Sequence, residues 1–283
     1  MNLLVVLIVL GLRQMGMAVE PAATVSALMR GWRDRWLGRG EKEAWGGWLV
    51  LAFVVLLPTL LVAALVTLLA GVWHSLFVHV LSLLVMLIVL LDRRQPDVMQ
   101  REREAWLLAD EEHRALLVQT DPATLAAAAT SEFARVRRSL LEEQLRELFA
   151  PLFWYLLLGP IAAIAYYFLR LAAEMQDGAA QKARELLHYA DWPVARLLAL
   201  SFALAGDFVA TWGHWRGQVL NAGVEAGVLL DDSAAAAQPV DLTLGQGQAP
   251  GAVMGQGLEI VAALLQRALV IWIVLLALHT LWP

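Results

Sequence analysis

The polar cluster with the clearest chemical potential in this sequence runs from His188 to Arg196. Asp191, Trp192 and Pro193 fit a helix start, with Asp191 as the capping residue and Arg196 about one turn further on. An arginine at such a place suits an anionic group, because its planar guanidinium forms paired hydrogen bonds with phosphate or carboxylate oxygens. Two interpretations stay open: a capped helix anchored at a membrane interface, and a small polar site in which Arg196 holds an anion.

Patterns for other kinds of chemistry are absent from the sequence. Because the chain contains no cysteine, disulfides, thiolate metal sites and cysteine nucleophiles are excluded. None of the six histidines has a carboxylate at metal-ligand spacing on one helix face, except His113, which follows Glu112 on a charged surface. The glycine-rich stretch 245–257 lacks the Gly-Lys-Ser/Thr signature of a phosphate loop, and no Gly-x-Ser-x-Gly motif occurs. We therefore predict no catalytic residue, no cofactor and no metal site.

The composition points to a membrane. Of the 283 residues, 60% are hydrophobic and 17% are charged, which is too apolar for an ordinary soluble domain. The net charge of −5, and the lack of any zinc-finger or RNP-type pattern, exclude a basic nucleic-acid-binding protein. We predict an all-α, polytopic helical membrane protein with amphipathic interfacial helices, so that the lipid bilayer is its first partner.

Uncharged runs place the predicted spans, since a span needs about 20 apolar residues. Residues 46–91 contain two such runs, 46–72 and 76–91, and are predicted to form a transmembrane hairpin. The segment 151–173 carries Gly159 and Pro160 at its centre and is either a kinked span or a re-entrant hairpin. Residues 260–283 are predicted to form a C-terminal transmembrane helix. The N-terminal segment 1–19 is predicted to be a retained, partial membrane helix, with Arg13 near the interface or facing protein.

The remaining segments are predicted to face water. Arginine and lysine are frequent in 20–45 and in the helical segment 92–150, which places both in the cytoplasm and the hairpin tip at His74 outside. An amphipathic helix is predicted to begin at Asp121 and Pro122 and to lead into Pro151. The segment 174–259 is predicted to contain helices over 181–189 and from 194 to about 215, followed by a flexible loop over 231–257. The sequence leaves open on which side of the membrane the segment 174–259 lies.

Three stretches of this chain resemble the AmpE family of Gram-negative inner-membrane proteins linked to β-lactamase regulation. They are FAPLFWYLLLGP (149–160), AYYFLR (165–170) and DWPVARL (191–197). The resemblance implies a multi-pass protein of the bacterial inner membrane that regulates or signals in β-lactamase induction and cell-wall recycling. It would act through a membrane or periplasmic protein partner, or through a bound anion such as a cell-wall fragment or a phosphorylated ligand.

The same stretches are more distantly similar to the CobD/CbiB family, which makes adenosylcobinamide phosphate. Around its Ala-Pro-Leu-Phe element that family has an acidic, Asn-containing pattern and an Asn-Thr-Leu-Asp pattern. This chain instead has Arg138, Glu142, Glu143 and Arg146 before the element and Arg170 after it. Since arginines in place of carboxylates reverse the local charge, a magnesium–phosphate site of that family would not operate unchanged.

The resemblances leave two functions open. The first is the regulatory protein described above, and the alternative is a membrane-bound transferase or ligase on a CobD/CbiB-like scaffold with an altered active site. In the alternative, charged residues on several segments would converge on one substrate. The candidate ligand-binding residues are Arg196, Asp191, Arg138, Glu142, Glu143, Arg170 and Arg13, and the candidate shape-determining residues are Gly159, Pro160, Trp192 and Pro193.

Overall fold

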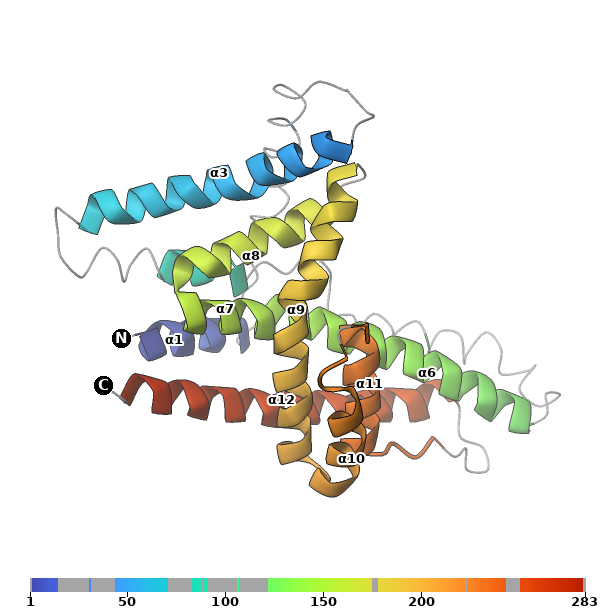
Figure 1. Ribbon diagram of the computed structural model, residues 1–283. Coiled ribbons are helices and arrows are strands. Elements are labelled where there is room, and N and C mark those ends of the chain that lie inside the picture. Colours follow the sequence, from blue (N-terminus) through green and yellow to red (C-terminus); the bar gives the residue numbers. More distant parts are fainter. Residues whose placement is uncertain are drawn as a thin grey trace. The chain divides into compact units, whose positions relative to one another are not determined.

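The computed structural model describes residues 2–14, 31, 44–70, 83–87, 89–90, 106, 122–174, 178–221, 223–242 and 250–281. All regular elements in these ranges are helices (Figure 1), which confirms the prediction of an all-α fold. They are α1 (Asn2–Gln14), α3 (Ala44–Ala70), α6 (Pro122–Gln144), the π-helical turn η1 (Leu145–Phe149), α7 (Ala150–Leu158), α8 (Pro160–Ala173), α9 (Gly178–Ala205), α10 (Phe208–Gln218), α11 (Ala226–Ala237) and α12 (Pro250–Leu281).

Some sequence predictions fall outside the described residues. They concern most of the basic segment 20–45, the hairpin tip around His74, and most of the stretch 91–121 with its predicted helix cap, Asp121. Of the second run of the predicted hairpin, 83–87 and 89–90 are described and are helical.

The chain forms two compact units, each assembled from segments that are distant in the sequence. Unit 1 consists of Met1–Arg94, Leu145–Val194 and Leu276–Pro283, and unit 2 of Gln95–Gln144 and Ala195–Leu275. The boundaries fall inside long helical stretches, so that α6 with η1, α9 and α12 each pass from one unit to the other.

Unit 1 is built around α3 and α8. The 27 residues of α3 include no charged side chain, so that the helix is apolar on every face. α3 packs against α8, which carries a buried aromatic and aliphatic face. The core residues of this contact are Val85, Val89, Ile164, Tyr167, Phe168 and Leu171, with Val55 and Val62 of α3 against them.

The segment 151–173 forms a helical hairpin. α7 ends at Leu158, Gly159 adopts a φ of 83°, and α8 begins at Pro160. Glycine tolerates this left-handed conformation without a Cβ clash, and proline suits the first position of the next helix. α7 and α8 then pack against each other (Figure 1). Of the two predicted alternatives, the structure therefore has the reversal at Gly159 and not a single kinked helix.

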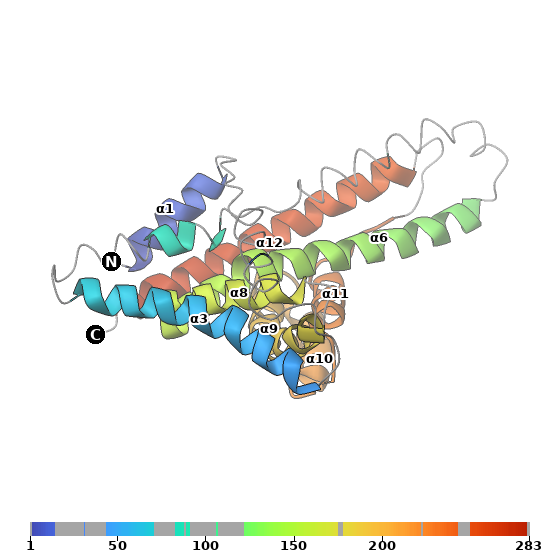
Figure 2. The ribbon, with the colours of Figure 1, turned by 90° about the horizontal axis from the view of Figure 1, so that it is seen from above.

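Unit 2 is built around α6, the predicted amphipathic helix, whose buried face includes Phe133, Val136, Leu140 and Leu141. α6 packs against α11, and α11 packs against α10. α6 and α12 approach closely (Figure 2), since a Cβ on Gly257 would lie 2.8 Å from the Phe133 ring. The Trp272 indole N–H donates to the Ser201 hydroxyl (2.9 Å) and so joins α12 to α9.

The predicted flexible loop over 231–257 is wrong for most of its length. Residues 231–237 belong to α11, and α12 begins at Pro250. Four successive alanines favour a helix, and the burial of Ser233, Ala234 and Ala237 stabilises it further. Further along, Gly251, Gly255 and Gly257 are buried in α12, and Gly257 allows close packing, since a Cβ there would lie 2.8 Å from the Phe133 ring.

The predicted helix start at Asp191 is also wrong. α9 runs without interruption from Gly178 to Ala205 and contains Pro193 in its interior. Leu187, Val194 and Leu198 are buried on both sides of the proline, so packing outweighs the lost backbone hydrogen bond. The helix predicted to continue to about 215 instead ends at Ala205, because the Asp207 N–H donates to the Ala237 carbonyl (2.8 Å) and Asp207 adopts an extended conformation as the N-cap of α10.

Among the residues that the structure describes, one helix, Gly251–Leu278, is long and apolar enough to cross a membrane. It covers most of the predicted C-terminal span but begins about ten residues earlier than 260. Val55–Ala64 and Pro160–Ala173 are shorter apolar helices.

Candidate functional site

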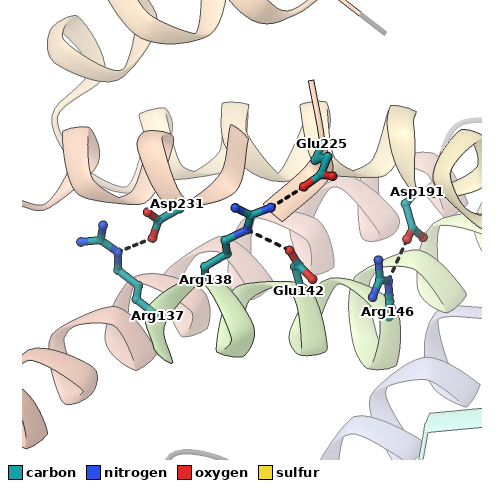
Figure 3. A network of polar contacts seen from close by, with 7 residues as sticks. All are labelled: Arg137, Arg138, Glu142, Arg146, Asp191, Glu225 and Asp231. Atoms are coloured by element: carbon teal, nitrogen blue, oxygen red, sulfur yellow. Dashed lines mark hydrogen bonds and ion pairs between the residues drawn. The ribbon is translucent and has the colours of Figure 1, made fainter. Parts of the chain in front are cut away.

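Asp191 lies at the centre of a buried polar cluster in unit 1. It is 1% exposed and accepts hydrogen bonds from Arg146 Nε (3.0 Å) and from the Tyr166 hydroxyl (2.6 Å). Figure 3 shows the Arg146–Asp191 pair, which joins η1 to α9. A buried carboxylate needs such donors, because an ionised group without them loses its hydration uncompensated. Asp191 thus holds three helical elements together.

Pro151 explains the positions of two further arginines in unit 1. Its ring nitrogen has no hydrogen, so it cannot donate to the carbonyl of Glu147 in an α-helical register or of Arg146 in a π-helical register. Arg170 Nη1 donates to the Arg146 carbonyl (3.1 Å), and Arg13 Nη1 donates to the Glu147 carbonyl (3.2 Å). The two guanidinium groups therefore take the place of the missing backbone donor.

Arg13 has additional contacts that fix α1 in unit 1. It donates to the Leu90 carbonyl (3.0 Å), and its guanidinium lies 3.7 Å from the Glu147 carboxylate. Arg13 is buried, and so are Val5, Val6 and Val9 on the same helix. Of the two placements predicted for Arg13, the structure has the one that faces protein.

In unit 2, charged pairs join α6 to α11 and to the residue before it. Arg137 donates to Asp231 (2.6 Å), and Arg138 donates to Glu142 (3.2 Å) and to Glu225 (Figure 3). Burial acts to lower the pKa of Arg138, but the bonds to the two carboxylates outweigh it and raise that pKa. Because these guanidinium groups already have carboxylate partners, the contacts serve the packing of α6 on α11.

Glu142 also lies against the backbone of α11. A Cβ on Gly227 would be 1.7 Å from the Glu142 carboxylate, so only glycine leaves room for it there. Gly227 belongs to the first turn of α11, where a negative charge is favoured by the helix dipole. Glu143, next along α6, is half-buried.

Arg196, the first candidate for an anion ligand, instead holds the end of α10. It is buried and donates through Nε to the Val219 carbonyl (3.2 Å) and through Nη2 to the Asn221 carbonyl (2.8 Å). The Trp215 indole N–H donates back to the Arg196 carbonyl (3.1 Å). Burial lowers the pKa of Arg196, and the carbonyl dipoles at the helix end offset part of that desolvation.

The other end of α10 is fixed as well. The Asp207 carboxylate accepts from the Ala210 N–H (3.0 Å) as an N-cap, and the Asp207 N–H donates to the Ala237 carbonyl (2.8 Å). Between these ends, Phe208 stacks on Trp212 and Trp212 on Trp215, with ring centroids 5.6 Å and 4.9 Å apart. Sequence reasoning missed this stack, although the spacing of four and three residues on one helix face was its signal.

Exposed apolar side chains occur on α10 and on the residues that flank it. Val209 is 82% and Leu220 is 85% exposed, and Leu204, Phe208 and Trp212 are exposed too. A rigidly held helix that shows aromatic and aliphatic groups to its surroundings has the composition of a protein contact surface. We call Leu204, Phe208, Val209, Trp212 and Leu220 the α10 surface.

The candidate residues are divided between the two units. Arg13, Arg170 and Asp191 belong to unit 1, whereas Arg138, Glu142, Glu143 and Arg196 belong to unit 2. Trp192 and Pro193 are half-buried within α9 and start no helix. Six of the candidates make hydrogen bonds or close contacts that stabilise the fold. They are Arg13, Arg170, Asp191, Arg138, Glu142 and Arg196. The sequence analysis proposed these side chains as ligand-binding candidates, and the structure gives them partners within the fold.

Within the described residues, no three His, Asp or Glu side chains lie close enough together to hold a metal ion. No protein-family model, no curated protein and no solved structure matches this chain.

Proposed function

We propose that this protein is a multi-pass regulatory or signalling protein of the bacterial inner membrane, of the AmpE type, which acts through a protein partner bound at the α10 surface. The regulatory role in β-lactamase induction and cell-wall recycling rests on the sequence resemblance. The proposed mode of action rests on one observation, the α10 surface. It is apolar and aromatic, and it lies on a helix whose two ends are held by hydrogen bonds.

The change of exposed face along α12 supports the membrane location. Up to Arg267, the exposed side chains include Gln256, Glu259, Gln266 and Arg267, as expected for contact with water. Between Arg267 and Leu278, they are Val270, Val274, Leu275 and Leu278, a stripe that suits lipid. A helix in water throughout would keep polar residues on its exposed face to the end.

Several features of the α10 surface favour a protein partner. Tryptophan and arginine are enriched among the interface residues that contribute most to the free energy of protein–protein binding. Trp212 and Arg216 are both exposed on α10. The aromatic rings are already stacked, so binding a partner loses little side-chain entropy. Arg196 would act as a positioning residue, because its bonds to the Val219 and Asn221 carbonyls hold the helix end in place.

The membrane location is tested by cysteine labelling, for which the chain has no background because it contains no cysteine. In isolated membranes, Gln256→Cys should react readily with a hydrophilic maleimide, and Val274→Cys should react only after the bilayer is dissolved. Equal labelling of the two before solubilisation would contradict the proposal. Asp241→Cys in intact cells then reports the side of the membrane on which this segment lies, since Asp241 is exposed.

The partner is tested by a photo-crosslinking amino acid at position 209, in cells that depend on this chain for β-lactamase induction. We expect a discrete protein adduct, which disappears together with induction in Trp212→Ala. His214→Ala, on the same helix and also exposed, is the matched control and should leave both unchanged. Adducts with lipid alone, or normal induction in Trp212→Ala, would contradict a protein partner at this surface.

A further inference from the structure

Unit 1 contains a cavity of about 470 Å³ between α3, α7, α8 and α9. Small-molecule sites typically measure about 300 to 1,000 Å³, so the volume is sufficient for a ligand. Its walls include Trp48 and Leu56 of α3, Trp154 and Leu158 of α7, and Tyr166 of α8.

The walls are suited to hydrocarbon. Apart from Trp48, Trp154 and Tyr166, every lining residue is alanine, valine or leucine. The Tyr166 hydroxyl is already bonded to Asp191, and the Trp154 indole N–H is buried without a hydrogen-bond partner among the described residues. A polar ligand would lose most of its hydration here, with little beyond the Trp154 N–H to compensate it, whereas an aliphatic chain gains from leaving water.

The cavity opens toward other exposed apolar side chains of unit 1. Leu56 and Leu158 both line it, and they are 55% and 65% exposed. Leu60, Leu61 and Leu157 on the same helices are exposed as well. Because this apolar surface leads into the cavity, an aliphatic chain could enter it directly from an apolar phase.

The other end of the cavity carries an ion pair beside an aromatic ring. The Lys182 ammonium lies 5.6 Å from the centre of the Trp48 ring, and it donates to both carboxylate oxygens of Glu185 (3.1 and 3.0 Å). Trp48 and Leu56 are eight residues apart on α3, which is a length of roughly 12 Å along the helix. The cavity thus runs from an aliphatic opening to an aromatic and charged end, as an amphiphile requires.

We propose that this cavity binds the single hydrocarbon chain of a membrane lipid, with the lipid phosphate at the Trp48–Lys182 end. The proposal rests on the membrane location argued above. The bound hydrocarbon chain belongs either to an acyl lipid or to an isoprenoid phosphate, since both kinds of ligand combine an aliphatic chain with a phosphate.

Binding is measured on the purified full-length protein in one constant detergent, with linear alkyl phosphates of increasing length. Each buried methylene contributes about 0.8 kcal/mol, so affinity should rise about fourfold per carbon and then level off when the cavity is filled. Decyl phosphate compared with geranyl phosphate, both of ten carbons, distinguishes the two sources. An affinity independent of chain length overturns the proposal.

Two variants locate the binding. Ala162→Phe fills the cavity and should reduce affinity at least tenfold, while Leu157→Phe, on an exposed residue outside the lining, should not. Lys182→Ala should weaken alkyl phosphates several-fold and leave the corresponding alcohols unchanged. Equal binding by Ala162→Phe and Leu157→Phe contradicts the site. If Ala162→Phe does not fold, Lys182→Ala decides. The proposed site is overturned if this variant loses affinity equally for alkyl alcohols and alkyl phosphates, or loses affinity for neither.

The binding test of the lipid site and the labelling test of the membrane location can fail independently of each other. If Val274→Cys is protected by the bilayer and no alkyl phosphate binds, the membrane location stands and the lipid site is wrong. If Val274→Cys labels freely in membranes, the location itself is wrong, whatever the chain-length series shows.

Discussion

Arginine side chains serve different contacts beside Pro151 in unit 1 and on the exposed side of α6 in unit 2. In unit 1, Arg13 and Arg170 are buried and donate to the backbone carbonyls of η1. In unit 2, Arg135 and Arg138 of α6 are partly exposed and pair with carboxylates. Replacing an arginine of the first kind should lower the free energy of unfolding strongly, because a buried donor or acceptor left without its partner stays desolvated. Solvent and salt screen the second kind. The same residue type thus stabilises the fold to a very different extent in these two regions.

Asp191→Asn is expected to have the largest effect. The variant keeps the side-chain volume but removes the charge shared by Arg146 and Tyr166 in unit 1. We expect the free energy of unfolding to fall by about 2 to 3 kcal/mol, measured by urea unfolding of the purified protein in detergent. Glu185→Gln, at an exposed residue of the same helix, is the control. A loss no larger than that of the control would show that burial does not decide the outcome.

Gly206→Ala tests a backbone contact in unit 2 that is independent of charge. The added Cβ would lie 2.3 Å from the Ala237 carbonyl oxygen, which is backbone and cannot rotate away. We expect a loss of about 1 to 3 kcal/mol in stability, with α10 becoming sensitive to limited proteolysis. Gly213→Ala on α10 has open space around it and should instead be neutral or stabilising by up to about 1 kcal/mol. Similar behaviour of both variants would contradict this account.

Gly227→Ala tests the packing of Glu142 against α11. The new methyl group would displace the Glu142 carboxylate, which is the flexible end of a side chain, so we expect a loss of only about 1 kcal/mol. The loss should become smaller when Gly227→Ala is introduced into Glu142→Ala, because the clash is then absent. A double-mutant cycle of unfolding free energies measures the difference, and strict additivity would mean that the two groups do not interact.

Arg135→Ala should have the smallest effect, since its pair with Glu132 is exposed in unit 2. The hydrogen bond from Arg135 lowers the pKa of Glu132 below 4.5, so the pair stabilises above that pH and loses its contribution as the pH falls through the lowered pKa. We expect about 0.5 kcal/mol or less at pH 7 and no difference from the parent chain near pH 2. Unfolding curves at the two pH values check this, and a larger difference at low pH would reverse the predicted sign.

The sequence was sufficient for the helical class and for elements with a strong local signal. Pro122 marks the start of α6, and Gly159 with Pro160 marks the end of one helix and the start of the next. Asp191 was misplaced because Asp-Trp-Pro is a local helix-start pattern, whereas the burial of Asp191 against η1 and α8 is a tertiary contact. The helical part of the predicted loop was missed because its alanines become buried only when α6 and α10 pack against α11.

The roles of the candidate arginines followed from long-range contacts as well. Nothing local to Arg196 indicates that it bonds to carbonyls 23 and 25 residues further along the chain. Pro151 did contain a usable signal, because a proline in an otherwise helical stretch leaves a carbonyl in need of another donor. The sequence does not say which side chain supplies that donor.

The central claim is that arginines with the pattern of ligand residues serve as backbone donors, and Pro151→Ala tests it most directly. The variant restores an N–H at position 151, so the carbonyl of Glu147 or of Arg146 regains a donor within its own helix. Unfolding free energies of Arg13→Leu and Arg170→Leu, each with Pro151 and with alanine, form two double-mutant cycles. We predict that at least one arginine replacement destabilises by about 1 kcal/mol less in the alanine background. Identical losses in both backgrounds, for both arginines, would contradict the account.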